Sequence, residues 1–186
     1  MSQKIIVPKN YPMEGHELKK IISYKDIEEK IINISSDINE KYTNKRPIII
    51  CVLNGAFMFF ADLLKKIEIL YEIDFIKISS YENNIFSTKK ITLEKEINVN
   101  IIDRDIIIIE DIIDTGLSIN YLIEHFKCKK PRSISIATLL YKNKSKISIE
   151  KIDWIGFNID DQYVVGYGLD LSQIYRGLPN IYVINK

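Results

Sequence analysis

Residues 105–118 read Asp-Ile-Ile-Ile-Ile-Glu-Asp-Ile-Ile-Asp-Thr-Gly-Leu-Ser, and this stretch decides the fold. Its isoleucine run is short and β-branched, which is typical of a strand buried inside a sheet. Three acids follow at positions 110, 111 and 114, and a helical periodicity resumes at Leu117. We therefore predict a strand at 105–110 and a helix at 117–126. Ligands of open α/β sheets bind at such a carboxyl edge.

The turn between this strand and this helix carries small and hydroxyl side chains at Thr115, Gly116 and Ser118. Backbone N–H groups at a helix N-terminus suit a phosphate. The acids cannot bind phosphate directly, so we expect them to serve sugar hydroxyls, a metal ion or a proton. In an alternative interpretation the acids only cap the helix. Three acids beside a buried strand exceed what a cap needs, which disfavours that alternative.

Composition limits the possible classes of protein. A chain of 186 residues fits one domain with a sizeable core, and a net charge of +1 gives no electrostatic case for nucleic-acid binding. No apolar run approaches the roughly 20 residues of a membrane span. Cys51 and Cys128 show no metal-ligand spacing, so we interpret them as reduced thiols. We expect a cytoplasmic protein with no membrane or nucleic-acid partner.

Helical and strand patterns alternate along the chain. Isoleucines at positions 27, 31, 34 and 38 form one face of a helix. The predicted helices are 24–42, 57–66 and 117–126, and the predicted strands are 47–54, 70–80, 105–110 and 133–141. Residues 81–92 are polar and predicted as a loop. Such alternation favours α/β architecture with a parallel sheet. Short strand-like pieces follow at 153–159, 163–166 and 181–184.

Residues 106–116 combine four apolar residues, two acids, a short spacer and Asp-Thr-Gly. This pattern resembles the ribose-phosphate-binding signature of the phosphoribosyltransferases. The resemblance implies a type I phosphoribosyltransferase fold: a central, mainly parallel sheet flanked by helices, with a small hood subdomain. It implies a single domain over residues 1–186, with a core of about 23–145 and a hood formed by 1–22 and 146–186.

Further segments are similar to the hypoxanthine/guanine branch of this family, of the bacterial type. They are Val-Leu-Asn-Gly-Ala-Phe-Met-Phe at 52–59, Ser-Ser-Tyr at 79–81, Asp-Trp-Ile-Gly-Phe at 153–157, Val-Val-Gly-Tyr-Gly-Leu-Asp at 164–170 and Tyr-Arg-Gly-Leu-Pro at 175–179. The correspondence covers roughly residues 5–184. It implies purine salvage: a 6-oxopurine and 5-phosphoribosyl 1-pyrophosphate give a nucleoside monophosphate and pyrophosphate.

The resemblance also implies roles for the residues of the acidic turn. The 5′-phosphate-binding residues would be Asp114, Thr115, Gly116, Leu117 and Ser118. Glu110 and Asp111 would face the ribose hydroxyls, where carboxylates favour positive charge developing on the sugar. Asp114 would lie near N7 of the base as the catalytic general base or acid, a role that contributes roughly 10²–10⁴-fold.

For the pyrophosphate, the resemblance implies a loop at Leu53, Asn54 and Gly55, often with a cis non-proline peptide, together with Arg176. Mg²⁺ would neutralise the leaving group, largely through substrate oxygens. Asp170 would reach this metal, with Glu110 and Asp111 as further candidate ligands. Asn54 stands where several family members carry lysine. We therefore expect backbone rather than side-chain contacts to pyrophosphate there.

The implied purine site comprises Lys142, Tyr163 and Val164. Lys142 would donate a hydrogen bond to the 6-oxo oxygen. Adenine carries an amino group at that position, which is also a donor, so Lys142 would discriminate against adenine. Tyr163 would stack on the purine, and the carbonyl of Val164 would accept from a guanine 2-amino group. Ser80 and Tyr81 would open a mobile catalytic loop that excludes water. Glu82 follows Tyr81, where the family often has glycine.

Other functions stay open at this point. A non-catalytic regulator that binds the sugar pyrophosphate is one alternative, although it would need neither Asp114 nor Lys142. A xanthine-preferring enzyme is another. An aspartate-based phosphohydrolase is disfavoured because its two acids stand two residues apart, whereas Asp111 and Asp114 stand three apart. The family forms homo-oligomers, so we expect a dimer or a tetramer.

Overall fold

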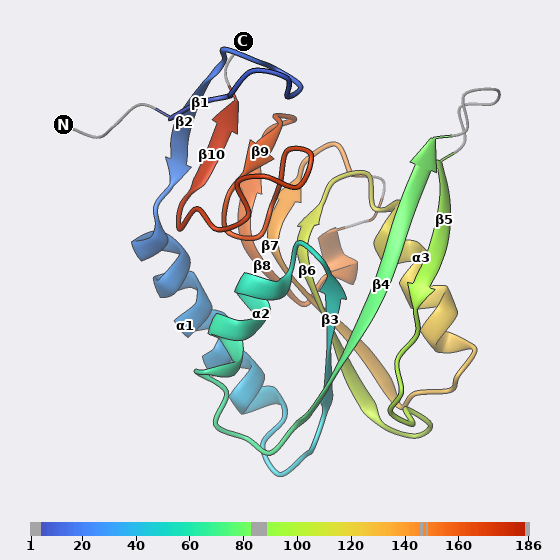
Figure 1. The fold of residues 1–186 in the computed structure, drawn as a ribbon. Coiled ribbons are helices and arrows are strands. Elements are labelled where there is room, and N and C mark those ends of the chain that lie inside the picture. Colours follow the sequence, from blue (N-terminus) through green and yellow to red (C-terminus); the bar gives the residue numbers. More distant parts are fainter. Residues whose placement is uncertain (1–4, 83–88, 146, 148, 185–186) are drawn as a thin grey trace.

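A computed structural model describes residues 5–82, 89–145, 147 and 149–184. Its centre is a six-stranded sheet in the order β5-β4-β3-β6-β7-β8 (Figure 1). The strands of this sheet are β3 (Ile48–Leu53), β4 (Glu72–Glu82), β5 (Lys89–Lys95), β6 (Asp105–Ile113), β7 (Ser133–Lys142) and β8 (Trp154–Ile159). All neighbours are parallel except β4 and β5. The predicted α/β class with a mainly parallel sheet is confirmed.

Helices cover both faces of this sheet. Helices α1 (Tyr24–Lys41) and α2 (Phe57–Leu64) lie on one face, and α3 (Leu117–Lys127) lies on the other (Figure 1). A short 3₁₀ helix, η1, spans Ile149–Lys151. Helix α1 begins at a capping box in which Ser23 and Asp26 satisfy each other's backbone N–H groups. Across the described residues, no helix combines the length and apolarity that a bilayer crossing needs.

The isoleucine run of β6 is buried on both faces. Ile107 and Ile109 pack in the cluster that contains α1 and α2, whereas Ile106 and Ile108 pack in the cluster that contains α3. All four side chains have no exposed surface. A strand covered on both sides needs apolar residues at every position, which explains why the sequence shows a continuous run rather than alternation.

A second, smaller sheet lies over the carboxyl edge of the large one (Figure 1). It is antiparallel, in the order β1-β2-β10-β9, and it joins segments from the two ends of the chain. Its strands are β1 (Ile5–Ile6), β2 (Glu17–Ile22), β9 (Val164–Val165) and β10 (Ile181–Ile184). A separate core of Val7, Leu18, Val165, Leu171 and Ile184 supports it.

One segment expected in the hood belongs to the large sheet instead. Strand β8 pairs in parallel with β7, so the expected core boundary near residue 145 is wrong for this segment. Gly156 allows the close approach, because a Cβ there would lie 2.4 Å from the carbonyl oxygen of Leu139. Trp154 then packs into the main core.

The loop prediction for residues 81–92 is also wrong in part. Tyr81 and Glu82 end β4, and residues 89–92 begin β5, while 83–88 lie outside the described residues. Strand β5 is at the edge of the sheet, where polar and charged residues are common. The polar sequence of this edge strand therefore led to the prediction of a loop where the structure has an antiparallel strand pair. Strand β6 runs on to Ile113, so Asp111 lies inside the strand rather than after it.

Candidate active site

The predicted site residues gather near the middle of the large sheet, where the connections from two neighbouring strands run to opposite sides. Strands β3 and β6 are neighbours, but α2 leads from β3 outward to β4, whereas α3 leads from β6 outward to β7. The carboxyl ends of β3 and β6 therefore lie at a topological switch point. Such a switch point is where open α/β sheets bind ligands.

A cleft of about 240 Å³ follows the turn between β6 and α3, and Ile91 of β5 forms part of its wall. It contains every residue predicted to bind the 5′-phosphate: Asp114, Thr115, Gly116, Leu117 and Ser118. Gly116 precedes α3 with φ +80°, a left-handed conformation that favours glycine. The turn thus places backbone N–H groups at the helix N-terminus beside the cleft, which suits an anion.

Glu110 and Asp111 reach this cleft from successive positions of β6. Glu110 is only 6% exposed, and burial together with the charge of Asp111 raises its pKa well above the ordinary value. Burial raises the pKa of Asp111 to about 6, although backbone N–H groups and Arg176 oppose that rise. Both carboxyl groups of this pair therefore hold a proton more tightly than an exposed acid does. Oε2 of Glu110 has no hydrogen-bond partner among the described residues.

The loop after β3 presses against the acid pair. The peptide bond between Leu53 and Asn54 is cis, as the resemblance implied, and Asn54 is exposed. A Cβ on Gly55 would lie 1.7 Å from Oδ2 of Asp111, so any other residue there would force this carboxylate to move. The carbonyl oxygen of Gly55 in turn lies against Gly168. The loop at Gly55, the loop at Gly168 and strand β6 therefore come together near the carboxylate of Asp111.

Arg176 and Asp170, predicted for pyrophosphate and metal, lie in contact. Arg176 Nη2 is 2.7 Å from Oδ1 of Asp170, and Nη1 donates to the carbonyl oxygen of Gly168. The backbone N–H of Gln173 donates to the other carboxylate oxygen of Asp170. Both oxygens of Asp170 thus have partners within this loop.

A second cleft of about 240 Å³ adjoins the first and shares Asp111 and Asp114 with it. It contains all residues predicted to bind the purine, Lys142, Tyr163 and Val164, and also Asp170. The Lys142 side chain is 8% exposed, and its Nζ lies 3.2 Å from Oδ2 of Asp114. The Tyr163 hydroxyl donates to the carbonyl oxygen of Asp170.

Two charged residues of this region were missed by sequence reasoning. Nζ of Lys144 lies 3.2 Å from Oδ1 of Asp114 and also contacts Asp161. Asp161 lies 3.4 Å from Nζ of Lys142, so two cations and two carboxylates alternate. The available signal was topological: β7 ends at Lys142, and Asp161 closely follows the end of its parallel neighbour β8.

The residues predicted to open a mobile loop lie in a hairpin. Ser80 and Tyr81 belong to β4, with their backbones opposite Ile91 and Lys90 of β5. Because Ile91 also lines the first cleft, this hairpin stands beside the turn between β6 and α3.

Carboxylates near the clefts suit a hard cation held by few protein ligands. Within the part of the chain that the structure describes, no group of three or more His, Cys, Asp or Glu side chains could hold a metal by itself. The unpartnered, buried Oε2 of Glu110 nevertheless offers an oxygen ligand. Mg²⁺ typically takes one or two carboxylates and completes its shell with water and substrate phosphates, so the residues fit it.

Residues 20–172 match the family model described as "Phosphoribosyl transferase domain". The hypoxanthine-guanine phosphoribosyltransferase of Bacillus subtilis is 41% identical over 173 residues, which cover 92% of this chain and 96% of that protein. The hypoxanthine phosphoribosyltransferase of Buchnera aphidicola is 39% identical, covering 89% of this chain and 95% of its own length.

Solved structures show the same relationship. A hypoxanthine-guanine phosphoribosyltransferase from Bacillus anthracis superposes with a TM-score of 0.84 at 38% identity, covering 90% of this chain and 98% of that chain. Fold, paired clefts and sequence relatives agree, and this chain belongs to the phosphoribosyltransferase family, within its hypoxanthine-guanine branch.

Proposed function

We propose that this chain is a purine-salvage enzyme that transfers the 5-phosphoribosyl group from 5-phosphoribosyl 1-pyrophosphate to hypoxanthine and guanine. The products are IMP or GMP and pyrophosphate. The relatives named above support this reaction. The observation that carries it is the pair of adjoining clefts that share Asp111 and Asp114, one at a phosphate turn and one beside Lys142.

The sugar phosphate would occupy the first cleft. Backbone N–H groups at the start of α3 and the hydroxyls of Thr115 and Ser118 would bind the 5′-phosphate. The carboxyl groups of Glu110 and Asp111 would form hydrogen bonds with the ribose diol. The negative charge of Asp111 would also favour positive charge that develops on the sugar.

The purine would occupy the second cleft, with one edge facing both Lys142 and Asp114. Lys142 would donate to the 6-oxo oxygen, and Asp114 would accept the proton from N7. As N9 forms its bond to C1′ of the ribose, the bond from C1′ to the pyrophosphate oxygen breaks, and its electron pair leaves with pyrophosphate. Tyr163 would stack on the ring, and the Val164 carbonyl would accept from the guanine 2-amino group.

Pyrophosphate would leave toward the loop at Leu53–Gly55. Backbone N–H groups there and the guanidinium of Arg176 would bind it, and the exposed amide of Asn54 adds no charge. Mg²⁺, when bound, would neutralise the developing negative charge of pyrophosphate. Glu110, Asp111 and Asp170 are the carboxylates that would hold the ion, and Asp170 would share its oxygens with Arg176.

Several wider features belong to the same proposal. The small sheet would act as the hood over the clefts, and the Ser80–Tyr81 segment would help to exclude water. We expect a cytoplasmic homo-oligomer, dimeric or tetrameric, with small-molecule substrates and no nucleic-acid or membrane partner. A preference for xanthine is the second candidate, because Lys142 would donate a hydrogen bond to the 6-oxo oxygen of xanthine equally well.

A competition assay tests the proposal. The purified protein is given Mg²⁺, the activated ribose and equal amounts of hypoxanthine, guanine, xanthine and adenine, and nucleotide products are separated by chromatography. We expect IMP and GMP to dominate and AMP to be absent. Predominant XMP would favour the second candidate. Binding of the activated ribose without any nucleotide product would instead identify a non-catalytic regulator.

A further inference from the structure

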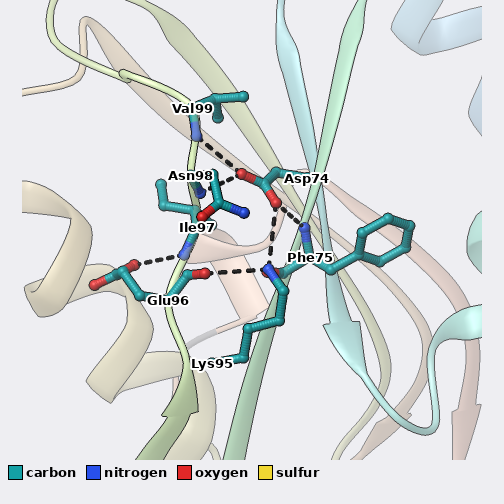
Figure 2. Close-up of polar contacts among 7 residues, drawn as sticks. All are labelled: Asp74, Phe75, Lys95, Glu96, Ile97, Asn98 and Val99. Atoms are coloured by element: carbon teal, nitrogen blue, oxygen red, sulfur yellow. Dashed lines mark hydrogen bonds and ion pairs between the residues drawn. The ribbon is translucent and has the colours of Figure 1, made fainter.

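Asp74 is a buried carboxylate that lies outside both clefts. It belongs to β4, near the N-terminal end of that strand (Figure 2). Its Oδ2 accepts the backbone N–H groups of Asn98 and Val99, just beyond β5, and its Oδ1 accepts the N–H of Phe75. One side chain therefore ties the chain leaving β5 back to β4.

Lys95, the last residue of β5, completes this connection (Figure 2). Its Nζ donates to the carbonyl oxygens of Phe75 and Glu96, at 2.6 and 3.1 Å, and lies 3.5 Å from Oδ1 of Asp74. Three backbone donors and one cation thus surround a carboxylate that is 6% exposed. Such a charge-assisted network resists distortion, because an unmade bond to a buried carboxylate is costly.

Glu96 extends the connection to the helix that begins at the phosphate turn. Its Oε1 accepts the backbone N–H of Ile97, and its Oε2 lies 2.7 Å from Nε2 of His125 and 3.0 Å from Nζ of Lys129. His125 belongs to α3, and Lys129 follows it. The chain at the C-terminal end of β5 is therefore joined both to β4 and to the C-terminal end of α3.

This connection bears on the site because β5 has little other support in the sheet. Strand β5 is at the sheet edge and pairs only with β4, and the register between them shifts between Lys77 and Ile78. Yet β5 supplies Ile91 to the wall of the phosphate cleft, and Ile91 stands opposite Ser80. The position of Ile91 thus depends on the contacts that Asp74, Lys95 and Glu96 make at the C-terminal end of β5.

We propose that Asp74 is a positioning residue for phosphoribosyl transfer, which holds the β4–β5 hairpin so that Ile91 and the Ser80–Tyr81 segment stand against the sugar-phosphate cleft. This inference rests on the proposed function. Asp74 touches no substrate. Without Asp74, Ile91 moves away from the sugar-phosphate cleft, and the activated ribose binds more weakly. The purine cleft, on the other side of Asp114, stays intact.

The test compares Asp74→Asn and Lys95→Met with Lys77→Gln. Lys77 stands opposite Lys95 and forms a more exposed cross-strand ion pair with Glu94, so its variant is a matched control on the same two strands. For both network variants we expect the KM for the activated ribose to rise roughly three- to tenfold. The KM for hypoxanthine should stay within about twofold, and the control should stay within about twofold for both substrates.

A merely structural role predicts a different result. Partial unfolding lowers the active fraction, so it reduces kcat for both substrates and leaves both KM values unchanged. That pattern in Asp74→Asn, or equal KM increases for both substrates, overturns the inference. If Asp74→Asn does not fold, Lys95→Met decides alone, and an unchanged KM for the activated ribose overturns it. Absence of IMP synthesis by the unaltered protein would instead reject the proposed function.

Discussion

Lys142 and Asp114 meet in the cleft that we propose for the purine, with Nζ and Oδ2 only 3.2 Å apart although they stand 28 positions apart in the sequence. Each residue ends or follows a central strand, β7 or β6, and these strands are parallel neighbours. The contact holds a hydrogen-bond donor and a proton acceptor side by side. A 6-oxopurine presents the complementary pair, an oxygen at C6 and a proton at N7.

Replacement of Asp114 by asparagine should abolish most turnover. Asparagine keeps the shape of the side chain but cannot accept the N7 proton, so kcat should fall roughly 10²–10⁴-fold while the KM values change little. Steady-state measurement of IMP formation tests this. A kcat close to that of the unaltered protein would refute the general-base role of Asp114.

Replacement of Lys142 by alanine should remove the preference for 6-oxopurines. The side chain is buried, and its loss leaves the 6-oxo oxygen without a donor, so kcat/KM for hypoxanthine should fall at least about tenfold. Lys144→Gln is the control, because Lys144 touches the same two acids from a more exposed position. Its effect should be about threefold or less. An unchanged ratio of hypoxanthine to adenine rates in Lys142→Ala would contradict the assignment.

Gly55→Ala should disable the site without unfolding the chain. The new methyl group would overlap the carboxylate of Asp111, which must move away from the sugar diol. We expect kcat/KM for the activated ribose to fall at least about tenfold. Gly177→Ala provides the control, since a Cβ there meets nothing within 4 Å. Equal activity of the two variants, with equal melting temperatures, would show that Gly55 does not position Asp111.

The pKa of Asp111 predicts how stability depends on pH. Burial raises this pKa to about 6 from 3.8, so between these values the folded protein binds more protons than the unfolded chain. Stability therefore rises as the pH falls through this window, and the ionised carboxylate costs about 1–3 kcal/mol at neutral pH. Asp111→Asn should raise the Tm at pH 7.5 and have little effect on Tm near pH 4.

Thermal melts of both proteins across pH 4–8 give the answer. A Tm of Asp111→Asn at or below that of the unaltered protein at pH 7.5 would contradict the predicted cost. The same variant should lose activity, because asparagine carries no negative charge toward the sugar. Gain of stability together with loss of turnover is the signature of a residue strained for function.

Much of this arrangement follows from local sequence patterns. The apolar runs of β3, β6 and β7 identify central strands, because strands covered on both faces admit few polar residues. The acids and the Asp-Thr-Gly turn after the β6 run locate the cleft that we propose for the sugar phosphate, because a strand end, a left-handed glycine and a helix start adjoin within one segment. The periodic isoleucines of α1 likewise reveal its buried face.

Other features were decided only by tertiary structure. Strand β5 is polar because it lies at a sheet edge, so its sequence is typical of a loop, and β8 joined the core because Gly156 permits close packing on β7. The contacts of Lys144 with Asp161, and of Asp74 with Asn98, join residues far apart in the chain. Local patterns report which face of an element is buried, but contacts between polar side chains depend on how strand ends are brought together in space.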